Sequence, residues 1–502
     1  MHKTMGYLGL DIGTGGCKAV IFDSEGRELA AAFREYPLLH PYPDHAELNP
    51  EEVINKCFEV ITEVNKRTTD PVVAMSISSQ GEAFTPIDRN GNILGNAMVS
   101  SDSRARNIAS SWSEDFGTEK IYRITGHTPH PLFTLFKILW IKENQPDVWE
   151  KTRYFLCFED LFHYRAGLEP KLSWSLAGRT MLFDVLKHTW NETILDSAGL
   201  SAGKLAVPVA PGEITGVIPL NDARKLGFRN PVTVVAGGHD QPVAALGAGV
   251  IETGMCMYAT GSVECFCPIL DTPSFSTDLQ QNNLCCYDYS IKGKYTSVAY
   301  SLTGGNILRW MRDELGQSER AEAASSKQNA YTLLLNAMPP EPTGLLVLPY
   351  FSASGTPYFD TRAKGAILGL TLTTGKGEII RALLEGVALE MKLNLELMEK
   401  AGMKIHKFIA TGGGTKHKAW TQLKADVLNK EIMLGAIREA GCYGAALLAQ
   451  SALEQIPVAD LVRRSKVENE VYIPDRKKAE TYERIFETYK KLYAVLQPFW
   501  ET

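Results

Sequence analysis

Three glycine-rich segments, each following an apolar stretch, are the first candidates for chemistry. They are Gly13-Thr14-Gly15-Gly16, Gly237-Gly238-His239-Asp240 and Thr411-Gly412-Gly413-Gly414. Glycine lets backbone amides approach an anion closely, and concave arrays of amides bind phosphate. The first segment is preceded by Asp11 and followed by Lys18, a set that suits nucleotide phosphates and hydrated Mg²⁺. The loop alone leaves open an ordinary hairpin turn with a solvated lysine.

Asp240 is the acid that we single out. It follows an apolar stretch and two glycines and precedes Gln241-Pro242, so we expect it to project into a cleft. A carboxylate there could take the proton of a hydroxyl whose oxygen attacks phosphorus. Capping of the helix expected over 242–246 is the alternative role, and one aspartate can do both.

Other nucleotide and hydrolase motifs are missing. Thr374-Gly375-Lys376-Gly377 lacks the GxxxxGK[ST] spacing of a P-loop. Gly247-Ala248-Gly249 lies too far past its strand to favour a dinucleotide-binding oxidoreductase. The chain has no G-x-S-x-G nucleophile elbow.

Alternating strands and helices must position these residues, which predicts an α/β architecture. Asn49-Pro50 begins a helix with an asparagine cap and proline in its first turn. Each glycine-rich segment is expected at one edge of a sheet, where open α/β folds bind ligands. Two similar halves should face a cleft, with connectors near 208–216 and 247–254. The expected strands are 7–12, 17–22, 72–78, 231–236 and 407–410, and a helix is expected over 419–429.

Composition is that of an ordinary globular protein. The 502 residues are 44 % hydrophobic and 22 % charged, with a net charge of −6. A mildly acidic chain is a poor candidate for binding nucleic acid or anionic lipid. No apolar stretch is long enough to span a bilayer, and residues 1–6 offer no signal-peptide core. We therefore expect a soluble, cytoplasmic protein that contacts neither nucleic acid nor membrane.

Nine cysteines are too few for a disulfide scaffold. Cys265, Cys267, Cys285 and Cys286 form one cluster in the sequence. Four thiols could bind zinc, but the spacing is not that of a CxxC knuckle. Buried thiols on neighbouring strands are the favoured interpretation.

Together these motifs resemble the FGGY family of carbohydrate kinases, in the actin–hexokinase–Hsp70 superfamily. The resemblance extends from Tyr7 to about Gln450. It implies an α/β protein with two ribonuclease H-like (actin-like ATPase) domains facing a catalytic cleft, over 1–246 and 247–502. It also implies the cofactors ATP and Mg²⁺. Asp11 is then expected to bind the metal, and Asp240, in the family's GxxD element, is expected to be the catalytic base.

The resemblance also assigns the nucleotide contacts. The opening loop, a second phosphate turn at 259–262, a contact at 304–306 and an adenosine motif from Thr411 follow in family order. The expected nucleotide-binding residues are Gly13, Thr14, Gly15, Gly16, Lys18, Thr260, Gly261, Ser262, Gly305, Arg309, Gly413, Gly414 and His417.

The sugar pocket is expected after the strand at 72–78. Asp102 and Arg104 lie in a stretch similar to the family's W-x-D-x-R motif, from which the tryptophan is missing. The implied substrate-binding residues are Gln80, Glu82, Asp102, Arg104, Asp240 and Gln241.

The residues of the expected sites do not decide which branch of the family the chain resembles most. Glu82 and Asp240-Gln241 resemble glycerol kinases, whereas Lys18 and the segment 125–131 resemble xylulokinases and gluconokinases. Gly81 and the segment 354–357 depart from the known branches.

We therefore expect ATP-dependent phosphorylation of a small carbohydrate, such as a xylulose- or gluconate-like sugar or sugar acid, by a protein that could form a homodimer. A glycerol- or erythritol-type polyol kinase is the alternative within the family. A non-catalytic nucleotide-dependent sensor or assembly protein, and a sugar-binding protein that does not use ATP, are the alternatives outside it.

Overall fold

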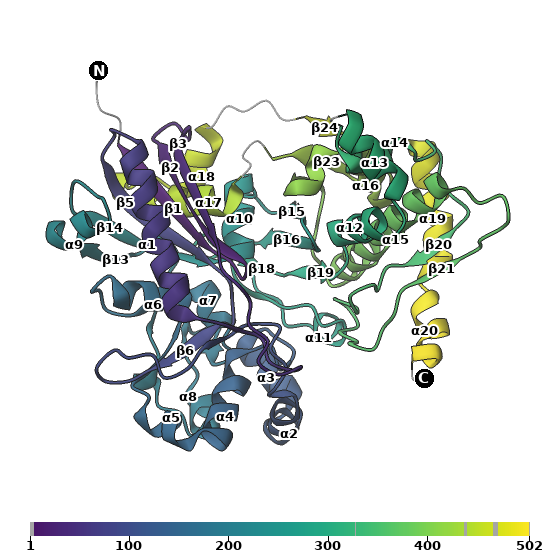
Figure 1. Ribbon diagram of the computed structural model, residues 1–502. Helices are drawn as coiled ribbons and strands as arrows, with labels where there is room; N and C mark the ends of the chain where they lie inside the picture. Colours follow the sequence, from purple (N-terminus) through teal and green to yellow (C-terminus); the bar gives the residue numbers. More distant parts are fainter. Residues whose placement is uncertain (1–4, 327, 436–438, 465–469, 501–502) are drawn as a thin grey trace.

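Two mixed β-sheets, one from each half of the chain, form the frame of the molecule (Figure 1). The computed structural model describes residues 5–326, 328–435, 439–464 and 470–500. Residues 1–4 lie outside the described residues. They are most of the segment 1–6, in which we expect no signal-peptide core.

The first sheet begins with the expected hairpin. Strands β1 and β2 pair antiparallel, with Asp11 opposite Lys18, and β1 pairs parallel with β5. The strands, in order across the sheet, are β13 (Ile214–Ile218), β14 (Val232–His239), β5 (Val72–Ser79), β1 (Gly6–Ile12), β2 (Gly16–Asp23) and β3 (Glu28–Glu35). Helix α1 (Pro50–Arg67) covers one face at β2 and β3, and α17 (Ala440–Glu454) covers the other at β1 and β5. Residues of β1 are therefore buried on both faces.

Helix α1 begins as the sequence predicts. The Asn49 side chain accepts a hydrogen bond from the Glu52 amide, and Glu51 and Glu52 lie in the first turn. The cap satisfies an amide that the helix leaves without a partner, and the two acids favour the positive end of the helix dipole.

The second sheet lies beside the first (Figure 1). Its strands, in order, are β17 (Tyr287–Asp288), β18 (Tyr295–Thr296), β16 (Glu264–Leu270), β15 (Met255–Thr260), β22 (Lys407–Thr411), β23 (Glu431–Leu434) and β24 (Val471–Tyr472), and β19 (Ala299–Ser301) pairs with β16. Strands β15 and β22 pair parallel, and β22 leads through a 3₁₀ turn (Gly413–Lys416) to α16 (Lys418–Leu428). The strand and helix expected at 407–410 and 419–429 are confirmed within a residue.

Helices α10 (Asp240–Ala248) and α17 pack together between the two sheets (Figure 1). Glycines bring the backbones into contact. A Cβ on Gly9 of β1 would lie 1.7 Å from the Cys442 carbonyl oxygen of α17. A Cβ on Gly247 would lie 1.9 Å from the Ala440 carbonyl oxygen, and one on Gly444 2.0 Å from the Val243 carbonyl oxygen. The sequence at these positions permits backbone contact that no larger residue allows.

The chain passes from the first sheet to the second at residues 249–254, between α10 and β15. The connector expected at 247–254 thus occupies this position. The one expected at 208–216 is wrong, because β13, an edge strand of the first sheet, begins inside it at Ile214.

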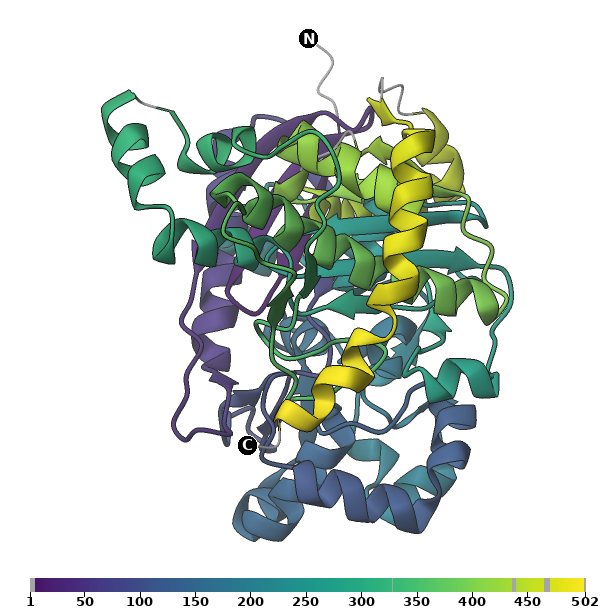
Figure 2. The ribbon, with the colours of Figure 1, turned by 90° about the vertical axis from the view of Figure 1, so that its right-hand side faces the viewer.

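Further helices extend each half. Below the first sheet in Figure 1 lie α2 (Arg106–Phe116), α3 (Thr118–Thr125), α4 (Thr134–Asn144), α5 (Pro146–Lys151), α6 (Phe158–Arg165), α7 (Trp174–Gly178) and α8 (Glu192–Ala198). A small sheet joins them through β4 (Glu47–Leu48), β7 (Ala97–Met98), β6 (Phe84–Ile87) and β8 (Tyr154–Cys157). The second half carries α12 (Gly305–Glu314), α13 (Gln317–Ser326), α14 (Ala330–Asn336), α15 (Lys376–Lys400), α19 (Arg476–Tyr489) and α20 (Leu492–Leu496). Figure 2 shows α19 and α20 running along one side of it.

The nine cysteines are free and buried. Sulfur atoms of the cluster have separate partners: Cys285 accepts from the Val298 amide, and Cys286 from the Ser274 amide. Across the described ranges, no group of three or more His, Cys, Asp or Glu residues could hold a metal ion. None of the helices in those ranges is long and apolar enough to cross a membrane.

Candidate active site

A cavity of about 580 Å³ lies between the two halves and contains most of the expected sugar-side residues. From the first half it is lined by Thr14, Gln80, Gly81, Glu82, Ser100, Ser101, Asp102, Ser103, Arg106, His130, Pro131, Leu132, Arg179, His239, Asp240 and Gln241. From the second half it is lined by Val263, Cys265, Val298, Tyr300, Leu302, Ser352, Ala353, Ser354, Phe359 and Thr361. Residues far apart in sequence thus share one cavity whose lining combines apolar and polar side chains, as ligand sites usually do.

The first glycine turn stands at the edge of the first sheet, between β1 and β2. Asp11 accepts a hydrogen bond of 2.6 Å from the Ser78 hydroxyl of the neighbouring strand. Burial and Glu439 raise the pKa of Asp11, while Ser78 and Lys18 act in the opposite direction. The Lys18 ammonium forms an ion pair of 2.7 Å with Glu439, directly before α17. The second half of the chain therefore contacts the strand that follows the first glycine turn.

Gln80 lines the cavity and hydrogen-bonds to this turn. Its side-chain amide donates to the Gly13 carbonyl over 3.0 Å, and its side-chain carbonyl accepts from the Thr14 hydroxyl over 3.1 Å. The Tyr36 hydroxyl also donates to the Gly13 carbonyl. The expected nucleotide and sugar sites are therefore contiguous at Thr14 and Gln80.

Asp240 is the first residue of α10, and its carboxylate faces the cavity. Burial raises its pKa to about 7, with Asp11 and Glu82 adding to the effect, against a hydrogen bond from Gln241 and the charge of Arg179. A carboxylate with a pKa near neutrality is suited to general-base catalysis. Gln241 lies beside it, and its buried Oε1 has no hydrogen-bond partner among the described residues.

The glycines before Asp240 belong to a bulged strand end, where the sequence predicts a turn. Strand β14 runs to His239, with a register shift between Val235 and Gly238. A Cβ on Gly237 would lie 1.8 Å from the Ile77 carbonyl oxygen of β5, so glycine is required there. The bulge continues as strand because buried side chains accept its amides: Glu159 accepts from Gly237 over 2.9 Å, and Ser175 accepts from His239 over 3.0 Å.

Glu82 is buried and forms an ion pair with Arg179, directly after α7. Its backbone is left-handed, with φ of 61°, a conformation that costs a non-glycine residue energy and is often found at functional sites. The Arg179 guanidinium lies 5.2 Å from the ring centre of Phe133 and 5.7 Å from that of Tyr287. Sequence reasoning missed Arg179, since no local pattern marks it.

The two expected substrate-binding residues Asp102 and Arg104 have different roles: the first lines the cavity, and the second hydrogen-bonds to the first. Asp102 lines the cavity, and it accepts hydrogen bonds from the Ala46 amide and from Arg104. Arg104 is absent from the cavity lining among the described residues; its guanidinium pairs with Glu47 and lies over Trp140. The neighbouring Arg106, which the sequence analysis did not include, lines the cavity instead.

The expected nucleotide turns of the second half come together at the end of β15. The Gly305 amide donates to the Gly261 carbonyl over 2.8 Å, which joins the turn at 260–262 to the start of α12. A Cβ on Gly414 would lie 2.0 Å from the Thr260 side chain, so the turn that begins at Thr411 contacts the turn at 260–262. His417 is the residue before α16 and makes no side-chain cap to it, and Arg309 is exposed on α12.

A buried ion pair supports these turns. Lys424 of α16 contacts Glu264 over 2.8 Å and donates to the Thr260 hydroxyl. Sequence reasoning missed this pair, which is separated by 160 residues.

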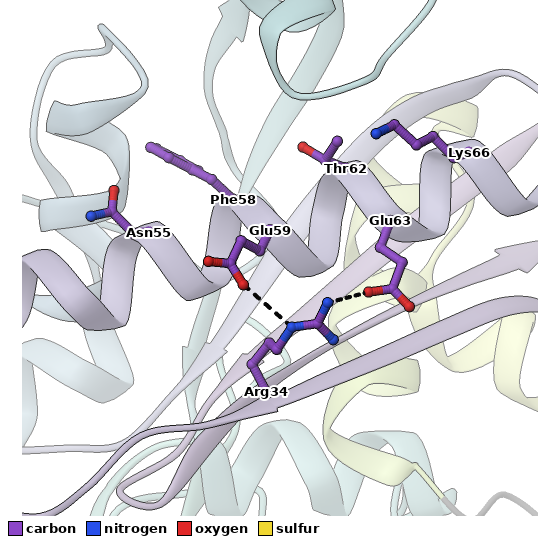
Figure 3. A pocket seen from close by; sticks show the side chains of 7 residues that line it. All are labelled: Arg34, Asn55, Phe58, Glu59, Thr62, Glu63 and Lys66. Carbon is purple, nitrogen blue, oxygen red and sulfur yellow. Dashed lines mark hydrogen bonds and ion pairs between the residues drawn. The ribbon is translucent and has the colours of Figure 1, made fainter.

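A second hollow of about 690 Å³ lies outside this region, on the surface of the first half. Figure 3 shows its lining, Arg34 of β3 and six residues of α1. The Arg34 guanidinium pairs with Glu59 and Glu63 (Figure 3). This hollow contains none of the expected site residues.

The two α/β halves, with a cavity lined from both of them, have the two-domain α/β architecture of the actin-like ATPase fold. Residues 6–247 match the N-terminal domain of the FGGY family of carbohydrate kinases, and residues 247–453 match its C-terminal domain. The chain therefore belongs to the FGGY family and is a carbohydrate kinase.

Relatives and solved structures agree with this assignment. The chain is 26 % identical to a xylulose kinase of Bacillus subtilis, over 97 % of this chain and 96 % of that protein. It is 30 % identical to a glycerol kinase of Thermococcus gammatolerans, over 89 % of each. The fold matches the crystal structure of a gluconate kinase from Lactobacillus acidophilus, with a TM-score of 0.89, 24 % identity and 98 % of each chain covered.

Proposed function

We propose that the protein transfers the terminal phosphoryl group of ATP to a hydroxyl of a small sugar, sugar acid or polyol held in the cavity between its halves. One observation carries the proposal. Asp240, a carboxylate with a pKa of about 7, shares this cavity with Thr14 of the phosphate turn and with Gln80 and Glu82. The domain division at 246/247 belongs to the same proposal, supported by the family match that changes at residue 247.

The turns fit the phosphates of a nucleotide. A Cβ on Gly15 or Gly413 would meet no atom within 4 Å, so open space faces both turns. Their amides, with the Lys18 ammonium and the Thr260 turn, would hold the phosphates. Asp11 would hold Mg²⁺, which takes few protein carboxylates and keeps several waters. When bound, Mg²⁺ neutralises charge on the phosphates.

Asp240 would act on the sugar. A hydroxyl beside its carboxylate loses its proton to that carboxylate as the oxygen bonds to phosphorus, and the bond from phosphorus to the ADP oxygen breaks. Gln241 supports this role by donating a hydrogen bond to the ionised form. Walls from both halves would exclude water, which otherwise competes as the acceptor.

The lining favours a polyhydroxylated substrate. Gln80, Glu82 and Asp102 supply acceptors, and the unpartnered Oε1 of Gln241 is an acceptor for a hydroxyl. Arg106 places a guanidinium at the same cavity, which suits a carboxylate on a sugar acid as well as hydroxyl groups.

Sugar-dependent release of ADP tests the proposal. The purified protein with ATP and Mg²⁺ is offered xylulose, ribulose, gluconate, glycerol and erythritol, and the products are identified by mass. Phosphorylation of xylulose, ribulose or gluconate supports the leading proposal, and selective phosphorylation of glycerol or erythritol supports the polyol alternative. ATP binding with no sugar-dependent turnover on a wider panel of sugars and polyols would favour a nucleotide-dependent sensor.

A further inference from the structure

His239 connects the proposed base to a tyrosine of the second sheet. Its Nε2 atom lies 3.2 Å from Asp240 Oδ1, and its Nδ1 atom lies 2.8 Å from the hydroxyl oxygen of Tyr287. Tyr287 lies on β17 and is fully buried, and His239 is buried at the end of β14. The three side chains form a continuous polar chain from the second sheet to the cavity.

Burial and nearby charge determine which atoms of these three side chains carry protons. Burial and the Arg179 guanidinium hold the pKa of His239 well below its usual range, so the imidazole is neutral. Burial also raises the pKa of Tyr287, which keeps its hydroxyl protonated. A neutral imidazole has one N–H and one acceptor nitrogen. When Tyr287 donates to Nδ1, the hydrogen of the ring is on Nε2, the atom that lies 3.2 Å from Oδ1 of Asp240. The other tautomer would place a lone pair against that carboxylate.

We propose that His239 is a positioning residue that holds Oδ1 of Asp240 and leaves Oδ2 to the substrate hydroxyl, and that Tyr287 selects the tautomer in which it does so. The inference rests on the proposed role of Asp240 as the base. Tyr287 belongs to the second sheet and the other two residues to the first sheet and α10. Orientation of the base therefore depends on contact between the halves.

Gly81 makes room for this arrangement. A Cβ on Gly81 would lie 3.1 Å from Cδ2 and 3.2 Å from Nε2 of His239, and 3.2 Å from Cγ of Arg179. A side chain at this position would press on the ring that contacts Asp240. The glycine at which the pocket departs from known branches of the family is thus the residue that lets His239 stand beside the base.

Among the described residues, His239 is the hydrogen-bond partner of the Tyr287 hydroxyl, and the other groups around Asp240 do not hydrogen-bond to that hydroxyl. They are Asp11 of β1, Glu82 after β5 and Arg179 after α7, and the uncharged Gln241 of α10 also contacts the carboxylate. A change in the pH profile of a Tyr287 variant therefore reports on His239.

The experiment compares Tyr287→Phe with Tyr289→Phe in the full chain. Tyr289 is equally buried and donates to the Val250 carbonyl over 2.7 Å, so it is a matched control for the loss of one buried hydroxyl. For Tyr287→Phe we expect kcat to fall about tenfold with little change in KM for ATP. The acidic limb of its kcat/KM profile should move to higher pH, because the ionised carboxylate loses its oriented donor. Tyr289→Phe should keep the parent profile.

Variants of His239 provide the rescue test. His239→Gln keeps an N–H near the position of Nε2 and should retain more activity than His239→Leu. In parent protein labelled with ¹⁵N-histidine, the His239 ring should show a hydrogen on Nε2, assigned by its loss in His239→Gln. This measurement decides the tautomer without a Tyr287 variant and without an activity assay.

The outcomes separate the two proposals. An active Asp240→Asn variant would reject the base itself. An inactive Asp240→Asn variant together with a Tyr287→Phe enzyme of parental kcat and pH profile would reject only the positioning role. A hydrogen on Nδ1 of His239 in the parent would also overturn it.

Discussion

Lys18 on β2 and Glu439 before α17 form an ion pair of 2.7 Å that joins the phosphate turn of the first half to the second half of the chain. The two side chains are 29 % and 34 % exposed. An ion pair this accessible contributes only about 0–1 kcal/mol to stability. The proposed exchange of Glu439 for phosphate oxygens as the partner of Lys18 would therefore cost little.

Replacing Lys18 tests its role toward ATP. Lys18→Ala removes a cation from the phosphate turn, so KM for ATP should rise about tenfold while KM for the sugar changes little. Lys225→Ala is a control, since Lys225 pairs with Asp222 on the exposed helix α9 (Leu220–Lys225). Steady-state kinetics with each substrate varied in turn give both constants. Parental KM for ATP with reduced thermal stability would make the lysine structural.

Glu439→Gln should have the opposite effect on ATP. The substitution removes a negative charge beside the expected phosphate site and releases Lys18, so KM for ATP should fall by about two- to fivefold. Isothermal titration with a non-hydrolysable ATP analogue measures the affinity directly. Weaker binding by the variant would show that Glu439 itself assists the nucleotide.

Asp240→Asn should abolish most turnover while both substrates still bind. Asparagine keeps the shape of aspartate but cannot accept the proton. Positioned general-base catalysis is worth roughly 10²–10⁴-fold, and kcat should fall by that factor. The expected cap role does not hold, because His239 occupies the cap position and Asp240 lies in the first turn of α10. A role limited to the helix dipole predicts near-parental kcat and a stability loss of about 1 kcal/mol or less. Measuring kcat and the thermal midpoint on the same variant distinguishes the two roles.

The pH dependence of activity should reflect the raised pKa of Asp240. Because the base must be ionised and its pKa is about 7, kcat/KM should fall about tenfold per pH unit below that value. Initial rates between pH 5.5 and 8.5 at subsaturating sugar trace this limb. A flat profile across pH 7 would contradict the assignment.

Stability should depend on pH with a definite sign at the same residue. The folded pKa of Asp240 is above its unfolded value of 3.8, so the folded state binds more protons between pH 4 and 7 and stability falls as pH rises through that window. Asp240→Asn removes this effect. The midpoint of the variant relative to the parent should therefore be higher at pH 8 than at pH 5, as calorimetry can test.

Glu82 should affect both the sugar and the fold. Glu82→Ala leaves Arg179 buried without its partner, a change that costs roughly 3 kcal/mol or more, and it removes an acceptor from the cavity. We expect a higher KM for the sugar, an unchanged KM for ATP and a lower thermal midpoint. Glu119→Ala breaks the exposed pair with Arg123 and serves as the control. An unchanged KM for the sugar in a folded Glu82→Ala enzyme would remove Glu82 from the pocket.

Local patterns predicted the frame of this molecule well. Apolar runs ending in glycine identified β1, β5 and β22, and the asparagine cap located the start of α1. These signals work because strand burial and helix capping depend on residues a few positions apart. The same patterns placed Asp240 at a strand end beside a helix, where the structure has it.

Groups that support the site could not be predicted in this way. Arg179, Tyr287 and Glu439 reach it from distant segments, and no local spacing marks such contacts. Arg104 shows a different limit: its guanidinium pairs with both Asp102 and Glu47 and lies over Trp140, so it supports Asp102 and, among the described residues, is not part of the cavity lining. Gly237-Gly238 was predicted as a turn, because the amide partners Glu159 and Ser175 that extend the strand lie more than 60 residues away.

The glycine contacts of α10 with α17 and of α17 with β1 have a mechanical consequence. Backbones that touch without intervening side chains cannot slide past one another without separating, so any rotation of one half on the other must pivot at this crossing. A rigid rotation moves atoms least near its axis. Asp240 begins α10 and is held close to the pivot, whereas walls further from it swing more widely. Such a rotation would open and close the cavity while Asp240, the proposed base, keeps nearly the same position.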